Sequence, residues 1–157
     1  MAVTFVAGSS PTYEEEAAAS ISGATPAGIA NDDTLLAAVF GRDALTTPSG
    51  WSVLHATTFD RSGATTHLTV YGKDTVTSAD ASTSFTFDCA TTDRMELAYA
   101  VLRGVDSVGA TTSNVVENST TVRITPAALT ADVDGEMFVY FVAMYFGVGL
   151  VASTPTP

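Results

Sequence analysis

The sequence has few positively charged residues, and this scarcity excludes one class of partner and argues against another. Its 157 residues include six lysines and arginines against seventeen acidic residues, which gives a net charge of −11, and Lys73 is the one lysine. Nucleic-acid affinity comes mainly from Lys and Arg side chains that neutralise phosphates, and anionic membranes attract the same side chains. The composition therefore excludes nucleic acid as a partner and predicts no electrostatic attachment to a membrane.

Residues that carry chemistry are also scarce. Cys89 is the single cysteine, so no disulfide can form within the chain. We expect it to be a small buried hydrophobe in a strand; a reactive or intermolecular thiol is the alternative. The two histidines, His55 and His67, stand in no pattern typical of a nucleophile or a metal site, and the sequence has no G-x-S-x-G, H-E-x-x-H or glycine-rich phosphate motif. We expect no enzyme activity, no metal and no cofactor.

A secretion signal is missing as well. Residues 1–6 lack both a basic segment and a long apolar segment. The sequence therefore predicts synthesis in a cytoplasm, whatever the final location of the protein.

What the chain does have is typical of β-structure. Hydrophobic residues make up 46% of the sequence and charged residues only 15%, and threonine and valine favour pleated, half-buried surfaces. Apolar or alternating runs recur with turn residues between them about every ten residues, and no helical period separates them. The expected strands are residues 4–8, 35–40, 51–55, 67–72, 84–88, 95–102, 120–124 and 136–146, and the expected turns are 62–63, 78–80, 93–94, 103–104 and 118–119.

These patterns predict an all-β fold, namely an antiparallel, jelly-roll-like β-sandwich of about eight or more strands with little or no helix. A single domain over residues 1–157 is expected, with an N-terminal arm or first strand in residues 1–19 and the sandwich body in residues 20–157. Residues 14–19 (EEEAAA) are the one stretch of strong helix formers. Because six residues are too few for a stable helix, we expect one turn or an irregular segment there, with the glutamates in solvent.

The C-terminal run from residue 137 to residue 157 contains no charged residue. It is too rich in glycine and β-favouring aromatics for a membrane-spanning helix, which usually needs about twenty apolar residues. A central strand buried on both faces and a strand whose outer face packs on another subunit both remain open. The second alternative makes four residues of this run candidate contacts with a subunit or a capsid: Phe138, Tyr140, Met144 and Phe146.

Two acidic corners each follow a TPA motif and precede an apolar run, at residues 31–33 and 132–136. Calcium prefers six to eight oxygen ligands, and these corners supply only the first few. Asp and Asn also stabilise tight turns by bonding the local backbone. Turns before strands are therefore expected, with weak calcium binding as the alternative.

Aromatic residues near sheet ends suggest a second kind of site. Trp51 follows the turn formed by residues 48–50, where it can either cap the core or face outward. An exposed ring would offer a stacking platform for a sugar, and Tyr71 and Tyr99 are further candidates for this role.

Three segments, taken together, resemble one family. Residues 25–39 (TPAGIANDDTLLAAV), 47–54 (TPSGWSVL) and 98–106 (AYAVLRGVD) are similar to the P-x-G-x-x-x-G-D-x-L-L-A, P-P-x-G-W-T and Y-R-G-V-D segments of a β-sandwich module found in virion proteins of tailed bacteriophages. The match runs in order over roughly residues 20–155. It departs from the family pattern at the Asn31-Asp32-Asp33 corner and at Leu102.

This resemblance implies a virion structural protein located in the particle. The role we expect is capsid decoration, in which the protein binds the head surface and stabilises it, either as a homo-oligomer or as a monomer clasped by the major capsid protein or another virion protein. The alternative is a tail-fibre or head-fibre module that binds glycans on the host surface.

Overall fold

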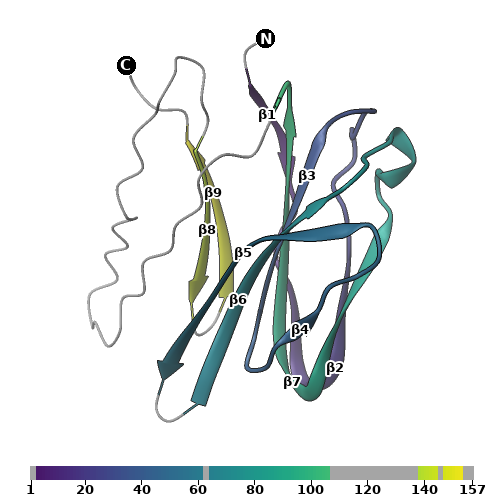
Figure 1. The fold of residues 1–157 in the computed structure, drawn as a ribbon. Helices are drawn as coiled ribbons and strands as arrows, with labels where there is room; N and C mark the ends of the chain where they lie inside the picture. The colour runs from purple at the N-terminus through teal and green to yellow at the C-terminus, as the bar shows by residue number, and fades with distance from the viewer. Residues whose placement is uncertain (1–2, 62–63, 107–137, 145–146, 154–157) are drawn as a thin grey trace.

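The computed structural model of the protein describes residues 3–61, 64–106, 138–144 and 147–153 (Figure 1). Strands dominate this part of the chain, and it contains no α-helix. The predicted all-β antiparallel sandwich is thereby confirmed. The elements are β1 (Thr4–Gly8), β2 (Thr12–Ala24), β3 (Thr34–Gly41), β4 (Leu45–Thr46), β5 (Trp51–Arg61), β6 (Ala64–Lys73), the 3-10 turn η1 (Ser78–Asp80), β7 (Ser84–Arg103), β8 (Phe138–Met144) and β9 (Gly147–Ser153).

The main sheet is organised around β7. Its strand order is β1-β7-β3-β6-β5, and β2 and β4 also pair with β7. Leu97, for example, pairs with Thr12 of β2 on one edge and with Val39 of β3 on the other. Both edges of this 20-residue strand are therefore occupied, β1 and β2 lying along one of them and β3 and β4 along the other.

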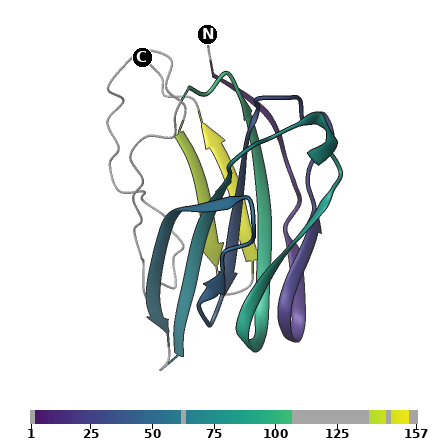
Figure 2. The ribbon, with the colours of Figure 1, turned by 45° about the vertical axis from the view of Figure 1, so that its right-hand side comes forward.

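The sheet folds back on itself because β2 and β7 bend together. The β2–β7 register shifts between Glu14 and Ala18 and again between Ala18 and Ser20. Such bulges bend a strand and increase its twist. Figure 2 shows both strands curving at the same end of the molecule. The first half of β7 thus lies over the second half of the same sheet, and the Phe87 ring packs 5.2 Å from that of Tyr71.

This bend corrects two of our expectations. Residues 93–94 were predicted to be a turn between two strands, but β7 runs through them without a break. Residues 14–19 were predicted to form one turn or an irregular segment, and they belong to β2, with the irregularity present as register shifts. In both places the strands stay extended through the change of direction although the pairing of β2 with β7 is interrupted, so polar and helix-favouring residues lie within strands.

The space between the folded-back halves is the larger core, which we call the inner core. Phe87 and Cys89 of the first half of β7 meet side chains from β3, β5, β6 and the second half of β7. Its largest fully buried side chains are Tyr71, Tyr99, Phe87, Ile21, Leu35, Met95, Leu97, Val39 and Val101. Residues on the other side of β3 and β7 alternate with these and belong to the opposite face of the sheet.

A separate two-stranded sheet, β8–β9, covers that opposite face (Figure 1). Val139 and Phe141 of β8 pack against Leu36, Ala100 and Leu102. Residues 35–39 are consequently buried without exception, as expected for a strand covered on both faces. The described part of the chain therefore forms three layers.

The strand predicted at residues 136–146 is present as β8, but the structure adds a second strand, β9, that was not predicted. The apolar run folds back as a hairpin, in which Met144 pairs with Gly147 and Phe138 pairs with Ser153. The longest described strand is β7. No helix among the described residues is long and apolar enough to cross a membrane.

Several other expectations are confirmed. Residues 4–8 form β1, residues 78–80 form the turn η1, and β7 ends at Arg103 before Gly104, whose φ of 77° suits a turn. Because β1 and the start of β2 pair with β7, the N-terminal segment is a constituent of the main sheet. The expected strand at 120–124, the turns at 62–63 and 118–119 and the corner at 132–136 lie outside the described residues.

Candidate functional site

The three aromatic residues considered as stacking platforms lie in the inner core. Trp51 is 4% exposed, and Tyr71 and Tyr99 are each 1% exposed. The Trp51 ring meets Phe85 and Phe87 edge to face, at centroid distances of 5.3 and 5.4 Å. None of the three rings presents a face to solvent, so the stacking prediction is wrong and the core interpretation of Trp51 is confirmed.

The local turn explains why Trp51 points inward. The backbone N–H of Trp51 donates a hydrogen bond to the carbonyl of Pro48 (3.2 Å), and Gly50 adopts a φ of 76°. A glycine tolerates this left-handed conformation, so the chain enters β5 with Trp51 directed at the inner core. Burial raises the pKa of the Tyr99 hydroxyl, which donates a hydrogen bond to the Gly23 carbonyl (3.1 Å).

The first acidic corner is a structural turn closed by an ion pair. Asp33 accepts the Ala30 N–H at 2.8 Å and forms two 2.7 Å bonds with the Arg103 guanidinium. Its side chain is 1% exposed, and the bonds from Arg103 hold the pKa of Asp33 below its usual value. Arg103 also donates to the Gly28 carbonyl (3.2 Å). The turn interpretation is confirmed at this corner.

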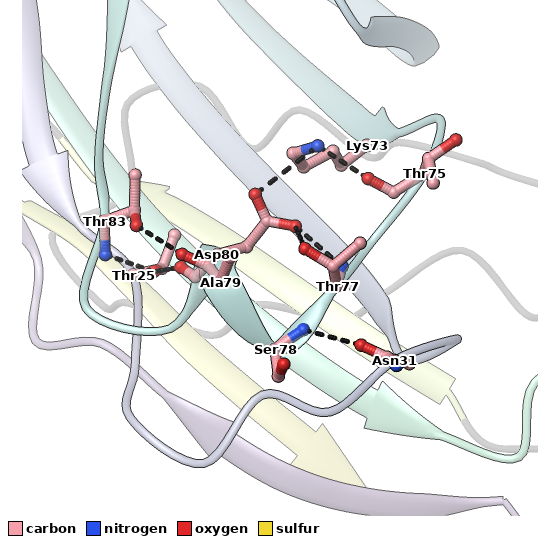
Figure 3. A network of polar contacts seen from close by, with 9 residues as sticks. All are labelled: Thr25, Asn31, Lys73, Thr75, Thr77, Ser78, Ala79, Asp80 and Thr83. Atoms are coloured by element: carbon pink, nitrogen blue, oxygen red, sulfur yellow. Dashed lines mark hydrogen bonds and ion pairs between the residues drawn. The ribbon is translucent and has the colours of Figure 1, made fainter.

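A polar network extends from this corner to η1 (Figure 3). Asn31 accepts the Ser78 N–H at 2.9 Å, while the Asp80 carboxylate accepts the Thr77 N–H at 2.7 Å and lies 3.5 Å from the Lys73 ammonium. Thr25 donates to the Asp80 carbonyl. These bonds fasten the loop before β3 to the turn before β7, so their role is to hold this end of the sandwich together.

Groups that could perform chemistry are not gathered in the described ranges. Cys89 is a free, buried thiol within the inner core, which confirms the structural interpretation of this residue. Over the same ranges, no group of three or more His, Cys, Asp or Glu side chains could hold a metal ion.

A shallow hollow of about 220 Å³ lies where β3 and β5 begin and β6 and β7 end. It opens on the face of the sheet that also carries β8–β9, because Leu36, Leu54 and Val105 line it and belong to the cluster that packs against Val139 and Phe141. Ser52, Asp74 and Asp106 provide polar atoms around it. Sequence patterns gave no sign of this hollow, because its residues come from four separate strand ends.

A buried acid lies on the same face. Glu96 of β7 pairs with Tyr13 on one side and Phe40 on the other, is 8% exposed, and has one carboxylate oxygen without a hydrogen-bond partner in the structure. Burial raises the pKa of Glu96 to about 7. The sequence signal was a single charge within the apolar run 95–102, which we did not interpret.

The predicted subunit or capsid contacts are placed only in part. Phe138, Tyr140 and Met144 belong to β8, but their side chains lie outside the described part of the chain, as does Phe146 entirely. The neighbouring Val139 and Phe141 face the main sheet. The contact role of the four residues stays a prediction.

The described architecture thus defines an all-β sandwich protein with a small acidic hollow and a buried carboxyl. No family model, curated protein or solved structure matches the chain.

Proposed function

We propose that this chain is a structural protein of a tailed-bacteriophage virion, and specifically a capsid decoration protein that binds the head surface and stabilises it. The observation that supports the proposal best is the spatial convergence of the three segments that resemble phage virion modules. Segments separated by up to about seventy residues in the sequence meet at one end of the sandwich.

The contacts between these segments are specific. Asp33 and Gly28 of the first segment bind Arg103 of the third. Trp51 of the second segment packs 6.4 Å from Tyr99 of the third, ring centroid to ring centroid. A resemblance confined to residues that stabilise one another describes a shared scaffold, so it supports a structural role better than a catalytic one.

The charge and the layer structure fit such a role. A net charge of −11 leaves the protein repelled by nucleic acid, which is consistent with a protein as its partner on the particle. The β8–β9 hairpin forms an outer layer that is hydrogen-bonded to no strand of the main sheet. We place the contact with the major capsid protein, or with a second copy of this chain, on the side of the molecule that carries this hairpin.

The glycan-binding alternative has less support. Its stacking candidates Trp51, Tyr71 and Tyr99 are core residues, and a sugar-binding platform needs an exposed ring. A tail-fibre or head-fibre module of this kind would then have to bind glycans through other residues.

Two measurements test the proposal. Immunogold labelling of particles with an antibody against the purified chain is expected to mark heads, and particles assembled without the chain are expected to bind it in a stoichiometric ratio to the major capsid protein. Label confined to tails would contradict the decoration role, and absence of label from purified particles would contradict a virion role altogether.

A further inference from the structure

The hollow between the strand ends combines an apolar floor with an acidic rim. Leu36 is buried and forms the floor together with the half-buried side chains of Leu54 and Val105. Asp74 and Asp106 stand at its margin and are exposed. A volume of about 220 Å³ accommodates roughly one long side chain or a ligand of similar size.

Asp74 is held in place before any ligand arrives. Its N–H donates to the Gly50 carbonyl (3.0 Å), and one of its carboxylate oxygens accepts the hydroxyl of Ser52 at 2.5 Å. Both partners belong to the turn and strand start next to the hollow. An acceptor fixed in this way loses little conformational freedom on binding.

The nearby cations do not neutralise this rim. Lys73 also lines the hollow, but its ammonium donates to the Thr75 carbonyl (2.6 Å) and lies 5.7 Å from the centre of the Phe85 ring, which packs on the inner core. Arg103, one strand further, is held by Asp33. Lys73 is also paired with Asp80 (3.5 Å), so the basic side chains described at this end of the sandwich are bound to acids other than Asp74 and Asp106.

We propose that this hollow binds an arginine side chain of a partner protein. The inference rests on the proposed function and names the chemistry by which the partner is recognised. The aliphatic stem of the arginine lies on Leu36 and Leu54. Its guanidinium group meets the carboxylates of Asp74 and Asp106. Arginine fits better than lysine because its planar group binds carboxylates in a bidentate manner and is more weakly hydrated.

The position of the hollow agrees with the interface proposed above. Leu54 and Val105 pack in the same cluster as Val139 and Phe141 of β8, so the hollow and the hairpin lie next to each other on one side of the molecule. A partner that covers the hairpin can therefore place a side chain in the hollow. The strongly acidic chain and a basic partner surface would attract each other at long range.

The first experiment tests the hollow without a capsid. Backbone amide NMR spectra are recorded while n-butylguanidinium chloride is added, with n-butanol and sodium chloride as separate controls. We expect saturable shifts at Leu36, Leu54 and Asp74 with a dissociation constant on the order of 10 mM, as is reasonable for so few atoms. Equal shifts with n-butanol, or no saturable shift with butylguanidinium, would overturn the inference.

A charge-matched pair of variants makes the test specific. Asp74→Asn/Asp106→Asn is expected to abolish the shifts, whereas Asp43→Asn/Asp88→Asn, which changes the same net charge beside β4, is expected to keep them. Retained binding in the first variant contradicts the proposal. If the first variant loses its cooperative thermal transition, Asp106→Asn alone replaces it, and a reduction of about threefold in affinity is then expected.

The same variants separate this inference from the proposed function. If particles bind the wild type and bind Asp74→Asn/Asp106→Asn about tenfold more weakly, with the Asp43/Asp88 variant unchanged, both proposals are supported. Equal binding of all three proteins contradicts the hollow and leaves decoration intact. Butylguanidinium binding without any capsid binding contradicts decoration and leaves the hollow intact. Self-association lost only in Asp74→Asn/Asp106→Asn would overturn the choice of partner, because the arginine would then come from a second copy.

Discussion

The two faces of the sheet around β3 and β7 are covered in different ways. On one face, large side chains such as Tyr71, Tyr99 and Phe87 meet a layer that is the same sheet folded back, so that hydrogen bonds continue from one layer into the other. On the opposite face, Leu36, Ala100 and Leu102 meet Val139 and Phe141 of a hairpin whose two strands pair with each other and with no other described strand.

This difference shows how one pair of strands encodes two kinds of packing. Alternate residues of β3 and β7 point to opposite faces of the sheet. The same sequence segment therefore specifies an aromatic core on one face and the contact with the β8–β9 hairpin on the other. The inner core is expected to provide most of the stability. We expect substitutions in the hairpin layer and in the hollow beside it to cost less stability than substitutions in the inner core.

The largest expected effect comes from the folded-back layer. Phe87→Ala removes a fully buried ring that contacts Trp51 and Tyr71, so we expect a loss of about 3–5 kcal/mol in the free energy of unfolding, measured by urea denaturation. Phe5→Ala, at an exposed ring of β1, serves as the control and should cost less than about 1 kcal/mol. Similar losses in the two variants would mean that the inner core does not dominate.

Glu96 tests the comparison on the face of the sheet opposite the inner core. The pKa of Glu96 in the folded protein, about 7, lies above the ordinary value of 4.5 for glutamate, so stability is greatest below pH 4.5 and declines as the pH rises towards 7. Glu96→Gln removes the cost of burying the charge, and at pH 8 we expect it to stabilise the protein by up to about 3 kcal/mol. Near pH 4 the two proteins should unfold at almost the same urea concentration. A pH-independent difference would contradict a buried ionisable carboxyl.

The ion pair at the end of the sandwich should have an intermediate effect. Asp33→Asn leaves Arg103 without its charged partner, and because that arginine is 45% exposed we expect a loss of about 2 kcal/mol at pH 7. Since the pKa of Asp33 is lowered in the folded protein, its contribution to stability is present above the ordinary aspartate value of 3.8 and is lost as the pH falls below it. The neighbouring Asp32→Asn is the matched control, with an expected change under about 0.5 kcal/mol.

The smallest effect compares equal substitutions in the two layers. Val101→Ala in the inner core is expected to cost about 2 kcal/mol, and Val139→Ala in the hairpin layer about 1 kcal/mol or less. Thermal unfolding followed by circular dichroism measures both. A larger loss at Val139 would show that the hairpin layer is an integral part of the core.

Much of the fold was predictable because local patterns decide strand formation. The alternation of residues 67–72 and the apolar run 35–40 mark β6 and β3 correctly. The continuity of β7 was not predictable, because Asp93 and Arg94 are typical turn residues and only the paired bend of β2 keeps them in a strand. The strand at residues 138–144 was predicted, but its partner at residues 147–153 was missed because Gly147 and Gly149 weaken the strand pattern there.

The candidate site was less predictable, because burial depends on contacts between distant segments. A strand pattern does not tell which face a second layer will cover, so Trp51 could equally have been a surface ring. Asp33 was predicted as a turn residue, yet its partner Arg103 lies seventy positions away. The hollow has no sequence signature at all, since Leu36, Ser52 and Val105 come from separate strand ends.

The pairing of β7 also determines the order in which the sheet can form during synthesis. Within the described part of the chain, β1, β2 and β4 find strand partners only in β7, whereas β3, β5 and β6 pair among themselves. The first, second and fourth strands therefore cannot pair until their partner residues between 84 and 103 have been made. Such distant pairing slows folding and leaves strand edges open to association with other nascent chains. The β3–β6–β5 unit is the part of the described main sheet that can form before β7 is made.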